Sequence, residues 1–333
     1  MRNLGHGSRA GACVVSLTLM TSACGNAMTS DAASAESADA KLSVATVYGL
    51  TSDPFWTTLG CGAKKEAERL GISYQEFTSA NGQSSSYAQK FALARQTKPN
   101  GMIVNPSNPN QFTKQYRALM DDGIPVVTIN SAEPATQYKV VGTDTENLDH
   151  LSRLPQLVPS GAGSMAVVNG IPGLQPVDSR LDPVVDAVKK ANPDLTVLPT
   201  RYTNYDIDRA TSSVSALLAA HPDLKVIVAA DGPDGTATAA AVKQAGKAGK
   251  VAVIALDATP TEVLALNAGT ITALVAQSPL QIGEQQVREV VNYLRQGQDG
   301  AVPASSAKTT VPQKLLTKDS VDESADWIYK SSC

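Results

Sequence analysis

The feature that most restricts the fold is a regular alternation of short apolar runs with longer helical stretches, beginning near residue 41. Each run has four to six residues, is rich in Val, Ile and Ala, and is flanked by polar or glycine residues. Such runs are typical of parallel strands buried on both faces, and their alternation with helices predicts an α/β fold. The expected strands are residues 42–47, 101–104, 125–129, 165–168, 225–229, 251–256 and 272–276. The expected helices include residues 57–70, 183–191, 206–220 and 235–245.

The strand pattern occurs twice along the chain, at an offset of about 120 residues. A chain of 333 residues has room for about two domains. We therefore expect two similar lobes, the alternative being that buried strands of any α/β protein resemble one another. The matching pairs are 44–47 with 165–168, 102–104 with 226–228, and 125–130 with 251–257.

The N-terminus has the features of an export signal. Arg2 and Arg9 precede a short apolar stretch at residues 10–20, which is too short to span a bilayer as a finished helix. Small residues at 21–23 then precede Cys24, an arrangement that resembles the bacterial lipoprotein signal, in which this cysteine is lipidated. We expect the chain to be exported and anchored by lipid to the outer face of the cell membrane, or to be periplasmic.

This interpretation has two alternatives, and the composition of the next segment argues against the second of them. Thr21 stands where a lipoprotein signal usually has Leu, so plain secretion with cleavage nearby is an alternative, as is a buried N-terminal helix. Residues 24–41 are rich in Ala, Ser and Asp and lack apolar periodicity, which is typical of a flexible tether.

The cysteine count predicts one disulfide. Cys13 lies in the signal and Cys24 is assigned to lipid, which leaves Cys61 and Cys333. An even remainder in an exported protein suggests that these two cysteines pair. The alternative is two free thiols.

Composition and motifs exclude several classes of protein. A formal net charge of −3 gives no basic surface for nucleic acid, and three histidines argue against a histidine-rich metal site. The chain has no nucleophile elbow, no phosphate-binding glycine loop and no Cys/His metal spacing. We therefore expect neither catalysis nor a cofactor or metal.

Polar and aromatic residues follow the expected strands. Ligands of open parallel sheets bind outside the carboxyl ends of the strands. Hydroxyls of a sugar need hydrogen-bonding groups, and its apolar ring faces pack on aromatic rings. The residues at these positions are Asp53, Phe55, Trp56, Asn105, Asn130, Arg180, Tyr205, Asp231, Asp257 and Gln277.

At these residues the chain resembles the type I periplasmic sugar-binding proteins, especially the ribose/galactose group. The resemblance covers roughly residues 41–297, and its last two motifs are the most specific. The motifs are Asp53-Pro54-Phe55-Trp56, Gly170-Ile171-Pro172-Gly173 followed by Arg180, Asn204-Tyr205-Asp206, Ala220-His221-Pro222-Asp223, Asp231 with Ala245-Gly246-Lys247, Asp257-Ala258-Thr259-Pro260, and Ala276-Gln277-Ser278-Pro279-Leu280-Gln281-Ile282-Gly283.

The resemblance implies the type I periplasmic binding protein fold. This fold is α/β, with two Rossmann-like lobes of parallel strands joined by three crossovers, near Thr143, Gln277 and Lys308, and it closes on ligand by a hinge motion. The expected division is a signal peptide at 1–23, a tether at 24–41, an N-terminal lobe at 42–143 and 278–308, a C-terminal lobe at 144–277 and 309–326, and a tail at 327–333.

The resemblance also implies a function and a role for each residue. The protein would be a monomeric receptor that captures a sugar or polyol and delivers it to an ABC permease. Alternatives are a ligand sensor for chemotaxis or signalling without transport, a sugar-acting enzyme, and a transcription regulator of the same fold. The hydrogen-bonding residues would be Asp53, Asn130, Arg180, Asp231, Asp257 and Gln277, with Phe55, Trp56 and Tyr205 against the ring.

The chain departs from the ribose binders in its charges. Asn130 and Ser131 stand where those proteins carry Asp-Arg, and Asp231 stands where they carry Asn. The expected pocket therefore holds three carboxylates against one arginine, which disfavours sugar acids and phosphates. Neutral or amino-bearing sugars and polyols are favoured instead.

Every candidate also has a purely structural interpretation. Among the acidic and amide residues, Asp53 and Asn130 could form turns, Asp231 and Asp257 could be helix N-caps, and Gln277 could be a plain crossover position. Among the aromatic residues, Phe55 and Trp56 could pack in the core, and Tyr205 could pack under a loop. Arg180 could form a surface ion pair with Asp182 or Asp186.

Overall fold

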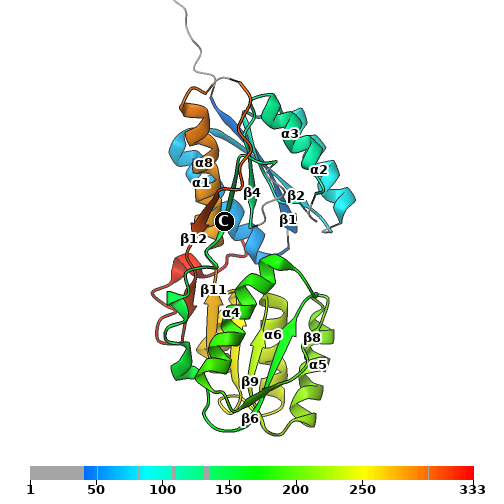
Figure 1. Cartoon of the computed structure of the whole chain (residues 1–333), viewed down its shortest axis with the longest axis vertical. Helices are drawn as coiled ribbons and strands as arrows, with labels where there is room; N and C mark the ends of the chain where they lie inside the picture. Colours follow the sequence, from blue (N-terminus) through cyan, green and yellow to red (C-terminus); the bar gives the residue numbers. More distant parts are fainter. Residues whose placement is uncertain (1–40, 51, 82, 107–109, 131–135, 299) are drawn as a thin grey trace, which may run out of the picture. The chain divides into compact units, whose positions relative to one another are not determined.

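The computed structural model describes residues 41–50, 52–81, 83–106, 110–130, 136–298 and 300–333. Residues 41–333 form one compact unit, in which the strands gather into two sheets (Figure 1). The signal peptide, Cys24, the tether up to residue 40 and Ser131 lie outside the described residues, so what was expected of them stays a prediction. In the described part of the chain, no helix has both the length and the apolar character to span a membrane.

The first sheet is parallel throughout, in the order β12-β5-β4-β3-β1-β2. Strand β1, which lies between β3 and the edge strand β2, is buried at six of its eight positions, and this explains its nearly continuous apolar sequence. The edge strand β2 is mostly polar. The strands are β1 (Ser43–Leu50), β2 (Ser73–Ser79), β3 (Gly101–Val104), β4 (Val126–Ile129), β5 (Lys139–Thr143) and β12 (Lys308–Val311).

Helices cover both faces of the first sheet (Figure 1). One face packs against α1 (Pro54–Leu70) and α8 (Pro279–Arg295), and the other against α2 (Ser84–Gln96) and α3 (Thr113–Asp121). The backbones of α1 and α8 approach so closely that a Cβ on Gly62 or Gly283 would overlap the other helix. Asp53 caps the N-terminus of α1, which starts at a proline, the residue favoured at the first helical position.

The second sheet has the order β13-β11-β10-β9-β6-β7, with the short β8 also paired to β6. All its pairs are parallel except that of β11 with β13. The strands are β6 (Gly163–Asn169), β7 (Leu195–Val197), β8 (Arg201–Tyr202), β9 (Leu224–Ala229), β10 (Ala252–Leu256), β11 (Ala273–Ala276) and β13 (Lys314–Leu316). The helices are α4 (Gln175–Ala191), α5 (Ile207–Ala220), α6 (Gly232–Gln244) and α7 (Pro260–Asn267), with 3₁₀ turns at Asp149–Leu151, Leu154–Leu157 and Ala325–Trp327.

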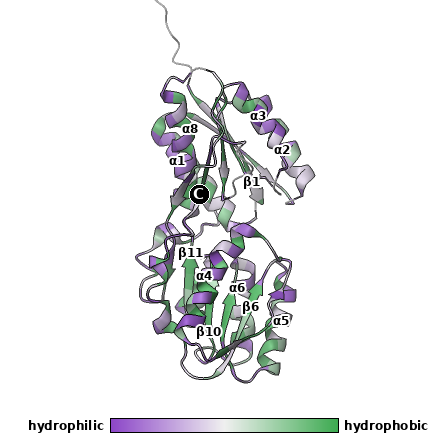
Figure 2. Cartoon of the chain, viewed as in Figure 1, coloured by the Kyte–Doolittle hydropathy of each residue, from purple (hydrophilic) through white to green (hydrophobic). Residues whose placement is uncertain are grey.

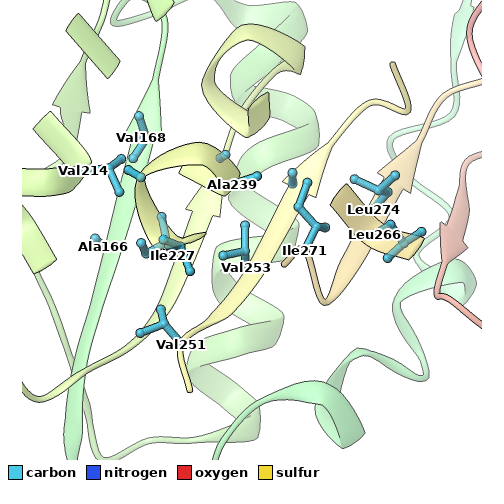
Figure 3. Packing of buried hydrophobic residues seen from close by; sticks show 14 of the residues in the cluster. Ala166, Val168, Val214, Ile227, Ala239, Val251, Val253, Leu266, Ile271 and Leu274 are labelled. Atoms are coloured by element: carbon cyan, nitrogen blue, oxygen red, sulfur yellow. The ribbon is translucent and has the colours of Figure 1, made fainter. Parts of the chain in front are cut away.

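Two apolar clusters sandwich the second sheet. Figure 3 shows the cluster on the side of α5, α6 and α7, where Val214 of α5 lies beside Val168 of β6 and Leu266 of α7 lies beside Leu274 of β11. The opposite cluster joins the sheet to α4. Figure 2 shows the same division by residue type, with hydrophobic strands inside and hydrophilic residues on the outer faces of the helices. The sequence-based α/β prediction therefore agrees with two covered parallel sheets.

Three connections run between the sheets. The first follows β5 after Thr143, and the second lies between β11 and α8 at Gln277. The third lies between β12 and β13, at Pro312 and Gln313 rather than near Lys308, because Lys308–Val311 pairs with β5 as a strand of the first sheet. The sequence around residue 308 has no apolar periodicity that could have located this strand.

Three helices start earlier than the sequence-based expectation. The helix expected at residues 57–70 begins at Pro54, the one expected at 183–191 begins at Gln175, and the one expected at 235–245 begins at Gly232. Pro183, the expected start of the second of these helices, lies inside α4. These shifts bring Phe55, Trp56 and Arg180 into helices that begin at the carboxyl ends of strands.

Candidate functional site

The candidate residues lie just beyond the carboxyl ends of strands from both sheets. Asp53 follows β1, while Asp231, Asp257 and Gln277 follow β9, β10 and β11 of the second sheet. Because neighbouring parallel strands end at the same edge, the last three residues come from one edge of the second sheet. The strand ends thus supply the positions that a ligand of such a sheet would contact.

Asp257 is the centre of this arrangement. Its Oδ1 accepts hydrogen bonds from Arg180 Nη1, Gln277 Nε2 and Tyr329 Oη, each at 2.9 Å. In the described part of the chain, all hydrogen bonds to this carboxylate end on Oδ1, so Oδ2 is the oxygen available to a ligand hydroxyl. Arg180 and Asp257 are only 6% and 9% exposed, which makes their ion pair a buried one. Arg180 therefore pairs with Asp257 and not with the neighbouring Asp182 or Asp186 of its own helix.

We call the part of the molecule built on the first sheet the first lobe, and the part built on the second sheet the second lobe. A series of hydrogen bonds joins Asp257 of the second lobe to the first lobe. Gln277 Nε2 donates to Asp257, and Gln277 Oε1 accepts from Thr143 Oγ1 at 2.5 Å. The backbone N–H of Thr143 in turn donates to Asn130 Oδ1 at 3.0 Å. Asn130 therefore uses its side-chain oxygen to hold the end of β5, and Gln277 connects the two lobes at a crossover. Gln313 Nε2 donates to the backbone oxygen of Asp144 at 2.9 Å, which also ties the first crossover to the third.

Backbone strain coincides with several candidates. Asn130, Tyr205 and Asp257 are non-glycine residues with φ of 55°, 61° and 80°. A left-handed backbone costs such residues on the order of 1 kcal/mol and persists only where the surroundings enforce it. The three hydrogen bonds to Asp257 Oδ1 supply that enforcement at one of the three positions. Strain of this kind is typical of functional sites.

Buried carboxylates gather beside Asp257. Asp231 caps α6 by accepting from the backbone N–H of Asp234 at 3.0 Å, so its N-cap interpretation is correct as local structure. Burial and the neighbouring Asp234 raise the pKa of Asp231 to about 8. Burial also raises the pKa of Asp234, and burial together with the charge of Asp257 raises that of Glu262 well above its usual range. Within the described residues, no group of three or more His, Cys, Asp or Glu side chains is arranged to hold a metal ion.

Asp53 of the first lobe is a further carboxyl group near Asp257. Asp53 Oδ1 accepts from the backbone N–H of Phe55 at 2.9 Å, as expected for a turn residue and N-cap. Burial and the charge of Asp257 nevertheless raise the pKa of Asp53 to about 6, against the lowering effect of this hydrogen bond. Asp53 therefore lies within electrostatic reach of the carboxylates of the second lobe.

The three candidate aromatic residues have different surroundings. The ring of Phe55 contacts that of Tyr329, with centroids 5.9 Å apart. Trp56 stacks on Tyr48 in the core of the first lobe, with centroids 6.1 Å apart, so it has the core-packing role as well. Tyr205 is 38% exposed and covers Gly170, where a Cβ would overlap its ring. The structure places Phe55 against Tyr329, whose hydroxyl binds Asp257, and places Trp56 against the core.

Sequence reasoning missed Thr143, Asp234, Glu262 and Tyr329 as members of this network. Asp234 lies three residues after Asp231 and Glu262 five residues after Asp257, both in the first turn of the helix that follows the candidate, and that position is a signal that could have found them. Tyr329 has no such signal, because it is 72 residues from Asp257 in the sequence.

Asp231→Asn is expected to raise the free energy of unfolding of the unliganded protein by about 1–3 kcal/mol at pH 8. The folded pKa is higher than the unfolded value of 3.8, so wild-type stability falls as the pH rises from about 4 to about 8. Asn caps a helix as well as Asp but carries no charge, so it removes this loss. Urea denaturation at pH 5 and pH 8 measures the difference.

The matched control is Asp206→Asn, which changes an exposed N-cap of α5 that accepts from Arg209 N at 2.9 Å. This variant should follow the wild-type pH profile. An equal gain of stability in both variants at pH 8 would show that the buried charge at Asp231 is not the cause.

Comparison with known proteins identifies the family. The sequence profile of the periplasmic binding protein domain matches residues 44–299, which is most of the chain. The chain belongs to the periplasmic binding protein family. Its predicted resemblance and its predicted type I fold are thereby confirmed, and the family name implies export to the periplasm.

Relatives within this family are named for sugars. The D-allose-binding periplasmic protein of Escherichia coli is 26% identical over 272 residues, covering 78% of this chain and 87% of the relative. The ribose import binding protein of the same organism is 28% identical over 284 residues, covering 84% of this chain and 92% of the relative.

Solved structures of sugar-bound solute-binding proteins have the same fold as this chain. An ABC transporter solute-binding protein from Agrobacterium vitis, bound to α-D-tagatopyranose, aligns with a TM-score of 0.73 and 25% identity, covering 87% of this chain and 100% of that one. A second, from Burkholderia graminis with D-arabinose, aligns with a TM-score of 0.71 and 25% identity, covering 85% and 98%.

Proposed function

We propose that this periplasmic binding protein captures a neutral sugar or polyol between its two lobes and delivers it to an ABC importer. The observation that carries the proposal is the hydrogen-bonded series from Asn130 through Thr143 and Gln277 to Asp257. It links the first lobe to an oriented carboxylate of the second. Such a link is suited to coupling ligand capture to movement of the lobes. The names of the relatives, which refer to allose and ribose, support the same class of ligand.

Each candidate residue has a proposed role. Asp257 Oδ2 accepts from a ligand hydroxyl, while Arg180 and Gln277 orient the carboxylate and donate to further oxygens. Phe55 offers an aromatic face beside this group, and Tyr205 offers another from above Gly170. The remaining members of the proposed ligand site are Asp53, Asn130, Asp231 and Trp56.

Asn130 and Trp56 take part less directly. The Asn130 oxygen already holds Thr143, so its amide nitrogen is the group left for a ligand. Trp56 supports the position of Phe55, whose ring it meets edge-on with centroids 4.9 Å apart.

The charges of the site determine the substrate class that we propose. Asp53, Asp231 and Glu262 lie within electrostatic reach of Asp257, whose ion-pair partner among the described residues is Arg180. A ligand carboxylate or phosphate would add negative charge to a group of carboxyls that already raise one another's pKa. Neutral sugars and sugars bearing an amine are therefore the proposed ligands, and acidic sugars are excluded.

We further propose how the protein is held outside the membrane. Lipidation of Cys24 anchors it, residues 24–41 act as the tether, and the binding unit is a monomer that meets its permease at the membrane surface. Catalysis forms no part of this function. The structure joins Cys61 of α1 to Cys333, with Cα atoms 5.4 Å apart, and we propose that this disulfide forms in the exported protein.

Calorimetry with matched ligand pairs tests the substrate class. We expect at least one of D-ribose, D-allose, D-arabinose and D-tagatose to bind with a dissociation constant of about 1–10 µM, a free energy near −8 kcal/mol. Ribose 5-phosphate should not bind, because its phosphate group brings negative charge, together with added bulk, into the site. Glucose and two charged derivatives give a second comparison on one sugar ring. Glucosamine adds a positive charge to glucose, and glucuronate adds a negative charge.

Two results would overturn the proposal. Binding of only the phosphate and the glucuronate would reverse the charge argument. Conversion of any bound sugar, seen by mass spectrometry of the recovered ligand, would make the protein an enzyme.

A further inference from the structure

The C-terminal residues 325–333, which we call the C-terminal strap, lie outside the matched family domain and yet contact the candidate site. The backbone N–H of Tyr329 donates to Ala258 O at 2.9 Å, immediately after Asp257. One residue further, Lys330 N donates to Thr58 Oγ1 of α1 at 2.6 Å. The strap is therefore hydrogen-bonded to both lobes within two consecutive residues.

Two more contacts fix the strap at its ends. Ser278 Oγ, at the start of α8, donates to the backbone oxygen of Asp326 at 3.2 Å. Cys333 is joined to Cys61 of α1. Tyr329 lies between these fixed points and is only 2% exposed. Its position is therefore set by the fold on both sides and does not depend on the Asp257 contact alone.

The side chain of Tyr329 joins two candidate residues. Its hydroxyl donates to Asp257 Oδ1 at 2.9 Å, and its ring meets the ring of Phe55 at 67°. Burial, together with the charge of Asp257, raises the pKa of Tyr329 well above its ordinary value, so the hydroxyl keeps its proton and acts as a donor. Because this neutral hydroxyl holds Oδ1, it fixes the orientation of the carboxylate and therefore of Oδ2, and it adds no further charge to the site.

We infer that Tyr329 is a positioning residue of the ligand site, which acts through Asp257 and is held in place by the C-terminal strap. The inference rests on the proposed function, since Asp257 is the group that Tyr329 aligns for a ligand hydroxyl. Arg180 and Gln277 approach the same oxygen from the second lobe and its crossover, whereas Tyr329 approaches from the strap. Of the three groups that donate to Asp257 Oδ1, the Tyr329 hydroxyl is the one that is positioned by the C-terminal strap.

Tyr329→Phe tests the inference, because it removes the hydroxyl and keeps the ring against Phe55. We expect about tenfold weaker binding of whichever of D-ribose, D-allose, D-arabinose and D-tagatose binds the wild type most tightly, measured by calorimetry at 25 °C. The control is Tyr293→Phe, which removes the hydroxyl of a buried tyrosine in the first lobe, where the ring packs on Tyr138. The control should bind within twofold of the wild type. Equal affinity of Tyr329→Phe and wild type would overturn the inference.

A ligand-free measurement separates this inference from the proposed function. In the unliganded wild type, the Tyr329 hydroxyl proton should give a slowly exchanging, downfield NMR signal that is absent from Tyr329→Phe and shifted in Asp257→Asn. If none of the four sugars binds the wild type, the proposed substrate class fails, and the NMR signal alone decides. A signal that is absent from the wild type, or unmoved by Asp257→Asn, would then refute the positioning role.

Discussion

Arg180→Met should lower the free energy of unfolding by about 3–5 kcal/mol and weaken sugar binding at least 100-fold. The guanidinium of Arg180 is the ion-pair partner of the buried Asp257 carboxylate. Three more acidic side chains, Asp53, Asp231 and Glu262, lie within electrostatic reach of that carboxylate. Methionine fills much of the volume but leaves Asp257 as a buried charge without its ion pair. Denaturation in urea, followed by circular dichroism, measures the stability, and calorimetry measures the affinity.

Two further variants make the Arg180 result specific. Lys190→Met removes an exposed cation from the same helix and should change stability by less than about 0.5 kcal/mol. Arg180→Lys keeps the charge but loses the planar fork, so it should retain part of the stability. A loss below about 1 kcal/mol in Arg180→Met would mean that the carboxylates are stabilised without this residue.

Loss of the Cys61–Cys333 bond should destabilise the protein by up to about 5 kcal/mol, the second large effect that we expect. The bond closes a loop of 272 residues, and constraint of the unfolded chain grows with loop length. The double variant Cys61→Ala/Cys333→Ser and the reduced wild type should lose similar amounts in urea denaturation. Alkylation without reductant supplies the control, since modification of both cysteines in the untreated wild type would mean that no bond exists to remove.

The sequence was most informative about the second lobe. The apolar runs ending at residues 229, 256 and 276 locate strands that end at these residues, so the next polar residues fall at one sheet edge. Asp257 and Gln277 were predicted from this logic, and the structure joins them directly. Strand β2 is absent from the prediction because its edge position leaves it polar, without the apolar run that marks the central strands.

Partners of individual side chains could not be predicted in the same way. For Arg180, sequence spacing offered Asp182 or Asp186 on the same helix as the structural alternative to a ligand, but the observed partner is Asp257, 77 residues away. The same limit applies to Phe55 and Trp56, which are adjacent in sequence yet face Tyr329 and Tyr48. Local patterns define which face is buried, whereas the choice of partner depends on tertiary contacts between distant segments.

The bond between Cys61 and Cys333 also gives the chain an unusual topology. With it closed, all residues from 61 to 333 belong to a single covalent ring, which includes both sheets except for strand β1. A protease that cuts one exposed loop of this ring opens it without releasing a fragment. In the periplasm, to which the family name implies export, a molecule nicked in this way keeps both lobes covalently joined.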